Sequence, residues 1–275
     1  YNCDFCMTNI GKRFLIREVQ EIEQDLDIAR KMYGSDVKKI FFLDGNAMIT
    51  PTDKLLKITN YAFEIFPHLE RCGLYAHSKD ILKKTDEQLK KLYEAGIKIA
   101  YVGFESGYDP LLEMIHKQAS KADHINASKK LMKAGITLSA TFINGLAGFN
   151  NPKISIQHAM HSADLVNKIC PEDDRIWYIA FLTLMIPRGT VLFNKKRRKE
   201  FSEMSSLEIL LELRAFVKLI KFQNKEANCV FRSNHASNYL PIKGILDRDK
   251  DKIISTINYG IDHPEILLAE YFRRL

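Results

Sequence analysis

The order in which short apolar segments and longer amphipathic segments alternate constrains the fold of this chain more than any other feature. Residues 39–43 (Lys-Ile-Phe-Phe-Leu) are typical of a buried strand, and residues 52–66 carry apolar side chains at helical spacing. The same order repeats along the chain. It predicts strands at 39–43, 74–77, 99–104, 138–143 and 176–184, and helices at 15–33, 52–66, 86–95, 122–134 and 154–169. Successive strand–helix units require a parallel sheet with right-handed crossovers.

Two architectures satisfy this pattern: an open doubly wound sheet, and a closed or partly closed barrel. A helix precedes the first strand, so a strand upstream of Tyr1 would complete a sixth unit, and Tyr1-Asn2-Cys3 is typical of a chain that starts inside a longer one. We therefore expect an α/β protein, a partial (β/α)6 TIM-like barrel with parallel strands. Residues 1–200 are expected to form the barrel core, and residues 201–275 a C-terminal helical and loop cap.

The cap is predicted from a change of rhythm. A long helix at 207–222 is followed by a polar segment at 228–238 and then by charged helical sequence. Residues 231–239 combine arginine, histidine and small polar side chains. Arg232 suits a carboxylate or phosphate and His235 suits proton transfer, so both are candidate catalytic residues. The open alternative is a tightly turned loop whose side chains bind its own backbone.

Composition excludes several classes of protein. Hydrophobic residues at 46% and charged residues at 27% are ordinary globular values, which excludes wholesale disorder. No uncharged apolar run approaches the roughly 18 residues that a membrane span needs. The net charge of +7 is modest and the basic residues are scattered, so the sequence does not predict nucleic-acid binding. Five cysteines, an odd number, do not suggest an extracellular disulfide framework, so a cytoplasmic location is predicted.

Polar and glycine residues follow the predicted strands at their carboxyl ends, where β/α folds bind ligands. These strand ends are Asp44-Gly45-Asn46, His77-Ser78, Glu105-Ser106-Gly107, Asn144-Gly145-Leu146 and Met185-Ile186-Pro187. The same residues also suit structural roles. Asp44-Gly45-Asn46 is a favourable turn, Glu105 and Ser106 suit a helix cap, and His77 suits a buried structural imidazole.

Cys3-Asp4-Phe5-Cys6 places two thiols close together in the sequence. Three interpretations are open: half of a zinc site, a redox dithiol, or two of the thiolates on an iron–sulfur cluster. A closed zinc site needs two further ligands, and the sequence has no second close pair of cysteines or of cysteine and histidine. The other cysteines (Cys72, Cys170 and Cys229) are isolated and are interpreted as small buried hydrophobes.

These motifs resemble those of the radical S-adenosylmethionine (radical SAM) superfamily. That family carries Cys-x3-Cys-x-aromatic-Cys after its first barrel strand, and Cys3, Phe5 and Cys6 match the last three elements. The first cysteine would lie two residues upstream of Tyr1. Asp44-Gly45-Asn46 resembles the Gly-Gly-Glu-like motif, with asparagine replacing glutamate. The surrounding residues 41–52 resemble a branch related to the coproporphyrinogen dehydrogenase-like and Elongator-like subgroups.

Three later phrases add to this resemblance. Residues 101–107 resemble the family's xGxESG strand end. Residues 143–148 resemble its xxGLPG strand end, with Ala147 replacing proline, and residues 184–190 resemble its PGT phrase. The five phrases stand in the family's order, which carries more weight than any one of them.

The resemblance implies an enzyme that uses a 4Fe-4S cluster to cleave S-adenosylmethionine reductively. The resulting 5′-deoxyadenosyl radical would abstract hydrogen from an unidentified substrate, small or anionic, with an electron donor such as flavodoxin or ferredoxin. Cys3 and Cys6 would bind the cluster. The implied cofactor-binding residues are Phe5 beside adenine, Asp44, Gly45 and Asn46 at the methionine amino group, Glu105 and Ser78 at the ribose, and also His77, Ser106, Asn144 and Gly145. The alternative is a metal-free β/α barrel that binds an anionic small molecule, with both cysteines incidental.

Overall fold

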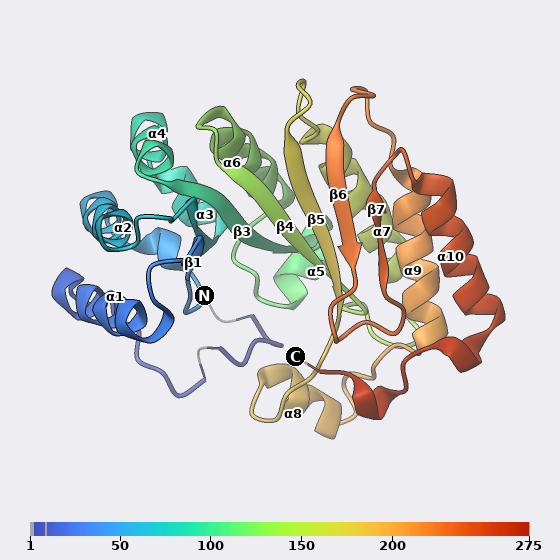
Figure 1. The fold of residues 1–275 in the computed structure, drawn as a ribbon. Coiled ribbons are helices and arrows are strands. Elements are labelled where there is room, and N and C mark those ends of the chain that lie inside the picture. The colour runs from blue at the N-terminus through green and yellow to red at the C-terminus, as the bar shows by residue number, and fades with distance from the viewer. Residues whose placement is uncertain (1–2, 9, 275) are drawn as a thin grey trace. The chain divides into compact units, whose positions relative to one another are not determined.

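A computed structural model describes residues 3–8 and 10–274, and these residues form a seven-stranded sheet in sequential order (Figure 1). The strands are β1 (Lys39–Phe42), β2 (Arg71–Ala76), β3 (Ile97–Glu105), β4 (Thr137–Asn144), β5 (Ile176–Thr183), β6 (Asn228–Ser233) and β7 (Ile242–Ile245). β1 pairs with β2, β2 with β3, and β5 with β6 in parallel, whereas β6 and β7 are antiparallel. The expected α/β class with a mostly parallel sheet is confirmed.

Every helix predicted from the apolar spacing is present, with shifted ends. The helices are α1 (Val19–Tyr33), α2 (Thr52–Ile65), α3 (Ser78–Lys83), α4 (Asp86–Glu94), α5 (Asp109–Met114), α6 (Lys121–Lys133), α7 (Pro152–Lys168), α8 (Val191–Arg197), α9 (Ser206–Leu219) and α10 (Lys250–Asp262), with short 3-10 turns η1 (Ala47–Ile49), η2 (Pro264–Ile266) and η3 (Glu270–Phe272). Local sequence explains several ends. Thr85 and Gln88 form a capping box at the start of α4, and Gly34 ends α1 with a φ of 74°.

Residues 228–238, described from the sequence as one polar segment, are not all outside the sheet. Their first half is β6, which extends the parallel sheet beside β5. Cys229, Phe231 and Ser233 are buried, while Arg232 between them is exposed. This alternation is a strand signal of period two. It was overlooked because polar side chains occur on both faces of the strand, Arg232 on the exposed face and Ser233 on the buried one.

The chain divides into two compact units. The first unit comprises Tyr1–Ile10, Gly103–Ile125 and Ala140–Leu275, and the second comprises Gly11–Val102 and Asn126–Ser139. β3, β4 and α6 each contribute residues to both units. The expected boundary at residue 200 stays a prediction.

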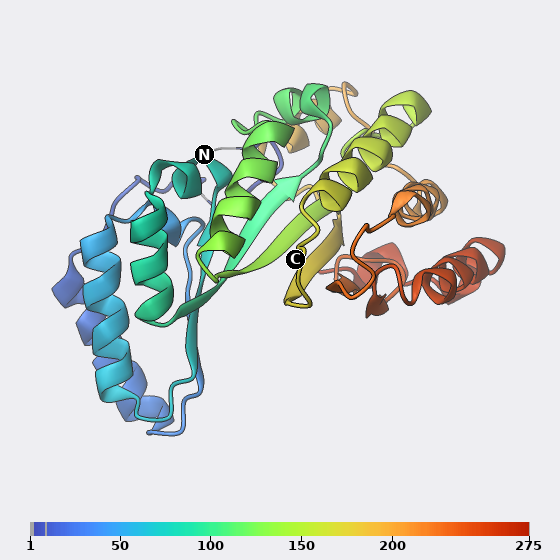
Figure 2. The same cartoon turned by 90° about the horizontal axis from the view of Figure 1, so that it is seen from above.

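In the second unit, α2 packs against α1 on one side and α4 on the other, and all three lie along the same face of β1 and β2 (Figures 1 and 2). The side chains that the helices and strands turn inward are apolar and buried; they include Leu55, Ile58, Leu74, Leu89 and Leu92. Burial of these faces supplies the free energy that short helices lack on their own.

In the first unit, α9 packs between α7 and α10 alongside β5, β6 and β7 (Figure 1). The core is aromatic. Phe181 stacks on Phe142 with ring centroids 5.1 Å apart and lies 4.5 Å from the ring of Phe216. Aromatic pairs of this kind add to the stabilisation that burial provides.

β7 is the last strand of the sheet and has only four residues. Its Ile245 N–H donates to the Asp249 carboxylate over 2.7 Å, just before α10 begins. No helix in the described part of the chain combines the length and the apolar character that a membrane span needs.

Candidate functional site

The two cysteines of the N-terminal motif lie on one tight turn, which the residue between them anchors. Cys6 N–H donates to the Cys3 carbonyl over 3.0 Å, and both thiols are free. Asp4 is 3% exposed. One carboxylate oxygen lies 2.6 Å from His116 Nδ1, and the other accepts from Lys195 Nζ over 2.6 Å. A buried carboxylate with two such partners fixes the turn against α8 and the segment after α5.

Phe5 packs into the apolar interior beside this turn. It contacts a cluster that includes the buried side chains of Leu111, Ile115, Leu146 and Leu192. Its packing helps to hold the cysteine turn in place. The predicted position of Phe5 beside adenine stays a prediction.

Glu105 ends β3 and forms a buried ion pair. Lys117 Nζ donates to Glu105 Oε1 over 3.0 Å, and both side chains are almost fully withdrawn from water. Glu105 has a φ of 64°, and its carboxylate folds back over Gly103, where an added Cβ would lie 2.3 Å from Oε1. A larger residue at Gly103 would therefore displace this carboxylate from its present position.

The same ion pair acts electrostatically on Cys3. Burial raises the pKa of the Cys3 thiol to about 11, while the Lys117 charge opposes that rise and Glu105 adds to it. The structure thus brings together Cys3, Glu105 and Lys117. Sequence analysis missed Lys117, because nothing in the local pattern distinguishes it from the many other lysines. The requirement that a buried Glu105 have a cationic partner was the only available signal.

Asn144 at the end of β4 carries an acceptor with no partner. Its side chain is 1% exposed, and Oδ1 has no hydrogen bond from any residue that the structure describes. A buried acceptor without a donor is costly, and such atoms are found where a ligand or water completes the site. Asn144, one of the predicted cofactor-binding residues, therefore offers a buried acceptor position to a ligand.

The backbone of Gly145 is hydrogen-bonded to a buried carboxylate. Gly145 N–H donates to Glu212 Oε1 over 2.9 Å, and Ser155 Oγ donates to Glu212 Oε2 over 2.6 Å. Burial raises the pKa of Glu212 to about 7. Gly145 has a φ of 90°, and an added Cβ would lie 2.7 Å from Ile209 Cδ1. The positive φ favours glycine here, and the contact with α9 adds to that preference.

Ser106 serves the protein interior. It is fully buried, its Oγ lies 2.7 Å from His158 Nδ1, and it accepts from Tyr108 N–H over 2.9 Å. Burial lowers the pKa of His158 to about 4, so this imidazole is neutral near pH 7. A contribution of Ser106 to cofactor binding stays a prediction.

In the second unit, the turn after β1 is tied to the end of β2 through Asn46. Asn46 Nδ2 donates to Asp80 Oδ2 over 2.7 Å, and Asn46 Oδ1 accepts from His77 N–H over 2.9 Å. Asp44 and Gly45 both have positive φ, 75° and 81°, as the turn requires. Sequence analysis singled out Asn46 and missed Asp80, which lies within α3 and follows no recognisable motif.

His77 and Ser78 are both buried at the start of α3. His77 is the residue before the first turn of that helix, and its Nδ1 accepts from Lys79 N–H over 3.3 Å. This capping contact is the structural role that histidine can take after a strand. The predicted cofactor contacts of both residues stay predictions.

The candidate catalytic residues of the predicted C-terminal cap lie at the surface. Arg232 is exposed on β6, with its guanidinium 5.1 Å from the ring centroid of Tyr178. His235 Nδ1 accepts from Ser237 N–H over 3.1 Å. The His235 contact is local, as in the alternative of a self-bonded polar loop, whereas Arg232 contacts a residue of the neighbouring strand β5. The catalytic roles of Arg232 and His235 stay predictions.

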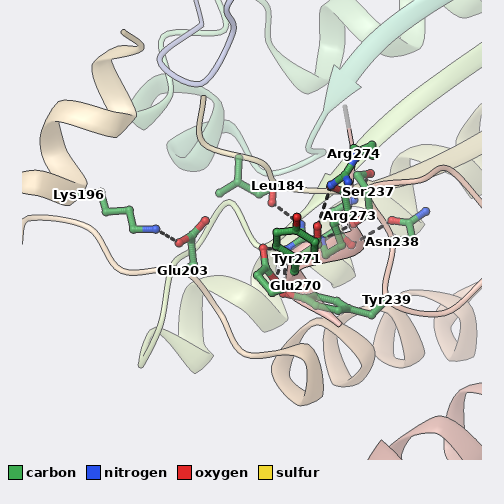
Figure 3. A network of polar contacts seen from close by, with 11 residues as sticks. Leu184, Lys196, Glu203, Ser237, Asn238, Tyr239, Glu270, Tyr271, Arg273 and Arg274 are labelled. Carbon is green, nitrogen blue, oxygen red and sulfur yellow. Dashed lines mark hydrogen bonds and ion pairs between the residues drawn. The ribbon is translucent and has the colours of Figure 1, made fainter. Parts of the chain in front are cut away.

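A buried arginine near the C-terminus fastens this loop (Figure 3). Arg273 donates to the carbonyls of Ser237 over 2.6 Å and Leu184 over 2.8 Å. It also donates to the Tyr239 hydroxyl over 2.8 Å and forms an ion pair with Glu270 at 2.6 Å. One planar guanidinium thus links the end of β5, the loop after β6 and the turn η3. Sequence analysis gave no hint of this network, because its members are far apart in the chain.

The cysteine turn fits an iron–sulfur cluster by donor type. Thiolates are the ligands such clusters use, and Cys3 and Cys6 offer two free thiols on one rigid turn. Within residues 3–8 and 10–274, no group of three or more His, Cys, Asp or Glu side chains gathers as a metal site. A cluster held here therefore needs a ligand beyond these two thiols.

Comparison of the sequence with known protein families gives one match over more than half of the chain. The family model described as "Radical SAM superfamily" matches residues 1–155. A curated relative, the uncharacterized methyltransferase PH0819 from Pyrococcus horikoshii, is 28% identical over 150 residues, which are 53% of this chain and 30% of that protein. The chain therefore spans less than a third of that relative's length.

Solved structures share the fold at low sequence identity. Coproporphyrinogen III oxidase (HemN) from Escherichia coli is 13% identical with a TM-score of 0.59, over 79% of this chain and 50% of that one. Elp3 from Methanocaldococcus infernus is 12% identical with a TM-score of 0.57, over 90% and 59%. Methylornithine synthase (PylB) is 16% identical with a TM-score of 0.52, over 98% and 79%. These likenesses confirm the partial-barrel fold class.

Proposed function

Because this chain belongs to the radical SAM superfamily, we propose that it is an enzyme whose 4Fe-4S cluster and S-adenosylmethionine act on a small or anionic substrate. Cys3 and Cys6 would hold the cluster, and with one electron from a donor the cluster and S-adenosylmethionine would supply the radical chemistry that abstracts hydrogen from that substrate. The observation that carries the proposal is the grouping of Cys3 with the buried Glu105–Lys117 pair.

Cys3 and Cys6 are the proposed cluster ligands. Asp4 holds their turn rigid through His116 and Lys195, so the thiols are positioned before any ligand arrives. The positive charge of Lys117 favours the thiolate form that a ligand requires, since it opposes the effect of burial on the Cys3 pKa.

Glu105, Asn144 and Asn46 are the proposed polar contacts of S-adenosylmethionine. Lys117 donates to one oxygen of the Glu105 carboxylate. The remaining lone pairs of that carboxylate can accept hydrogen bonds from ribose hydroxyls. Asn144 Oδ1 has a vacant acceptor position for a hydroxyl or amino donor. Asn46 Oδ1 accepts one hydrogen bond from the protein and has a second lone pair for the methionine amino group.

The electron donor, the cellular location and the substrate class are also proposals. The electron donor is a flavodoxin or a ferredoxin, the location is the cytoplasm, and the substrate is a small molecule. Arg232 and His235, from the C-terminal cap, are the proposed contacts of the substrate. The Arg232 guanidinium suits an anionic group on it.

The test is anaerobic reconstitution of the full-length protein with iron and sulfide. We expect iron to be bound and 5′-deoxyadenosine to be released from S-adenosylmethionine on addition of dithionite. The Cys3→Ala and Cys6→Ala variants are expected to lose both, whereas the Cys170→Ala control keeps both. S-Adenosylhomocysteine as a further product would indicate methyl transfer, as the name of the Pyrococcus relative suggests. Equal iron content in all four proteins would show that Cys3 and Cys6 are not the cluster ligands, and no bound iron in any of them would favour a metal-free barrel.

A further inference from the structure

The amide of Asn46 can adopt only one of its two orientations. Its Oδ1 faces the His77 N–H, which is always a donor, and its Nδ2 faces the Asp80 carboxylate, which is an acceptor. Turning the amide over would place a donor against a donor and an acceptor against an acceptor. The two contacts therefore fix the carbonyl oxygen toward the end of β2.

Asp80 is the member of this arrangement that a simple turn does not need. It is 2% exposed and belongs to α3, 34 residues away from Asn46 in the chain. Its second oxygen, Oδ1, accepts from Lys83 Nζ over 2.9 Å. Withdrawal of a carboxylate from water is costly unless both oxygens are bonded, and here each has a partner.

An asparagine is a weaker partner for an ammonium group than a carboxylate, because it carries no charge. A hydrogen bond from the asparagine amide to a buried carboxylate increases the negative character of the amide oxygen. Asp80 thus lies where a negative charge strengthens the acceptor at Asn46 without itself being at the turn.

We propose that Asp80 is a positioning residue for S-adenosylmethionine: through the Asn46–Asp80 hydrogen bond it orients the Asn46 amide and strengthens the amide oxygen as an acceptor for the methionine ammonium. The inference rests on the proposed function, in which Asn46 binds that group.

The experiment exchanges the two side chains. In the Asp80→Asn variant the charge is lost and the Asn46 amide is no longer held in one orientation. In the Asn46→Asp variant two carboxylates face each other. The double variant Asn46→Asp with Asp80→Asn restores one amide and one carboxylate in contact. Asp53→Asn is the matched control, because Asp53 lines the same surface pocket as Asp80, in the first turn of α2, and removes an equal charge.

Three quantities are measured for each reconstituted protein: iron content, the dissociation constant of S-adenosylmethionine, and the thermal unfolding midpoint of the metal-free form. We expect Asp80→Asn to weaken S-adenosylmethionine binding about tenfold, the effect of losing one charge-assisted hydrogen bond, at unchanged iron content. Asn46→Asp is expected to lower both the affinity and the midpoint, and the double variant to recover much of both. The control is expected to bind like the wild type.

Any of three results would overturn the inference while leaving the proposed function intact: Asp80→Asn lowers the unfolding midpoint without changing affinity, Asp53→Asn weakens binding as much as Asp80→Asn does, or the double variant is no better than Asn46→Asp. If the wild type binds iron and yet does not bind S-adenosylmethionine, the proposed function fails and the inference fails with it.

Discussion

Lys117 Nζ lies 3.0 Å from Glu105 Oε1, and neither side chain has significant access to water. Removing the lysine leaves an uncompensated buried charge. We expect Lys117→Met to destabilise the metal-free protein by about 3–5 kcal/mol, as for other broken buried pairs. Denaturant unfolding is the measurement. The double variant with Glu105→Gln is expected to recover part of the loss, and a double variant as unstable as Lys117→Met alone would contradict this account.

Glu212 makes the stability of the fold depend on pH. Its pKa rises from an ordinary 4.5 to about 7 in the folded protein, so folding favours the protonated form. The stabilisation is fully present below pH 4.5 and is lost as pH rises to 7 and above, about 3 kcal/mol in total. His158 Nε2, 3.8 Å from Glu212 Oε1, stays neutral over this range because its own pKa is about 4.

Replacing the Glu212 carboxyl group with an amide removes this dependence of stability on pH. Relative to the wild type, Glu212→Gln is expected to gain free energy of unfolding between pH 5 and pH 8. The measurement is denaturant unfolding of both proteins at each pH. A difference between them that does not change with pH would show that Glu212 ionises normally.

Asp4 is expected to control how well the cysteine turn accepts iron. Asp4→Ala removes the acceptor for His116 and Lys195 and frees the turn between Cys3 and Cys6. We expect iron content after reconstitution to fall severalfold, since the thiols lose their fixed spacing. Asp25→Asn is the control, because its ion pair with Arg17 is exposed and contributes little. Full iron binding by Asp4→Ala would refute the anchoring role.

Arg273 is expected to be the most sensitive position near the C-terminus. Arg273→Ala leaves the carbonyls of Ser237 and Leu184 without their donor and Glu270 without its ion pair. The expected loss is about 3 kcal/mol, together with faster proteolysis of the loop after β6. Arg274→Ala is the control, because its side chain is exposed and bonds only to nearby carbonyls. Equal proteolysis of the two variants would contradict the network's role.

The sequence was informative where structure depends on local repetition. The strands and helices of the β/α units followed from apolar spacing, because buried faces impose a period on the chain. The strand β6 was missed because polar residues occur on both of its faces, Arg232 outside and Ser233 inside. The strand ends were also predictable, since parallel folds expose polar groups there, and Glu105, Asn46 and Asn144 were chosen on that ground.

The partners of these residues were not predictable. Lys117, Asp80 and Arg273 act on groups that lie 12, 34 and up to 89 residues away in the chain. Which lysine or aspartate meets a given strand end depends on the folded geometry, and a single sequence contains many equivalent candidates. The residue types of the site could thus be anticipated, whereas the contacts that tune them required the structure.

The Asp249 carboxylate beside β7 has a consequence for how the protein behaves at high concentration. A terminal strand with unpaired N–H groups invites a second molecule to add its own strand, which begins aggregation. With Ile245 N–H already bonded and β7 limited to four residues, that edge offers little template for such growth. We therefore expect the β7 edge to resist the addition of a strand from a second molecule.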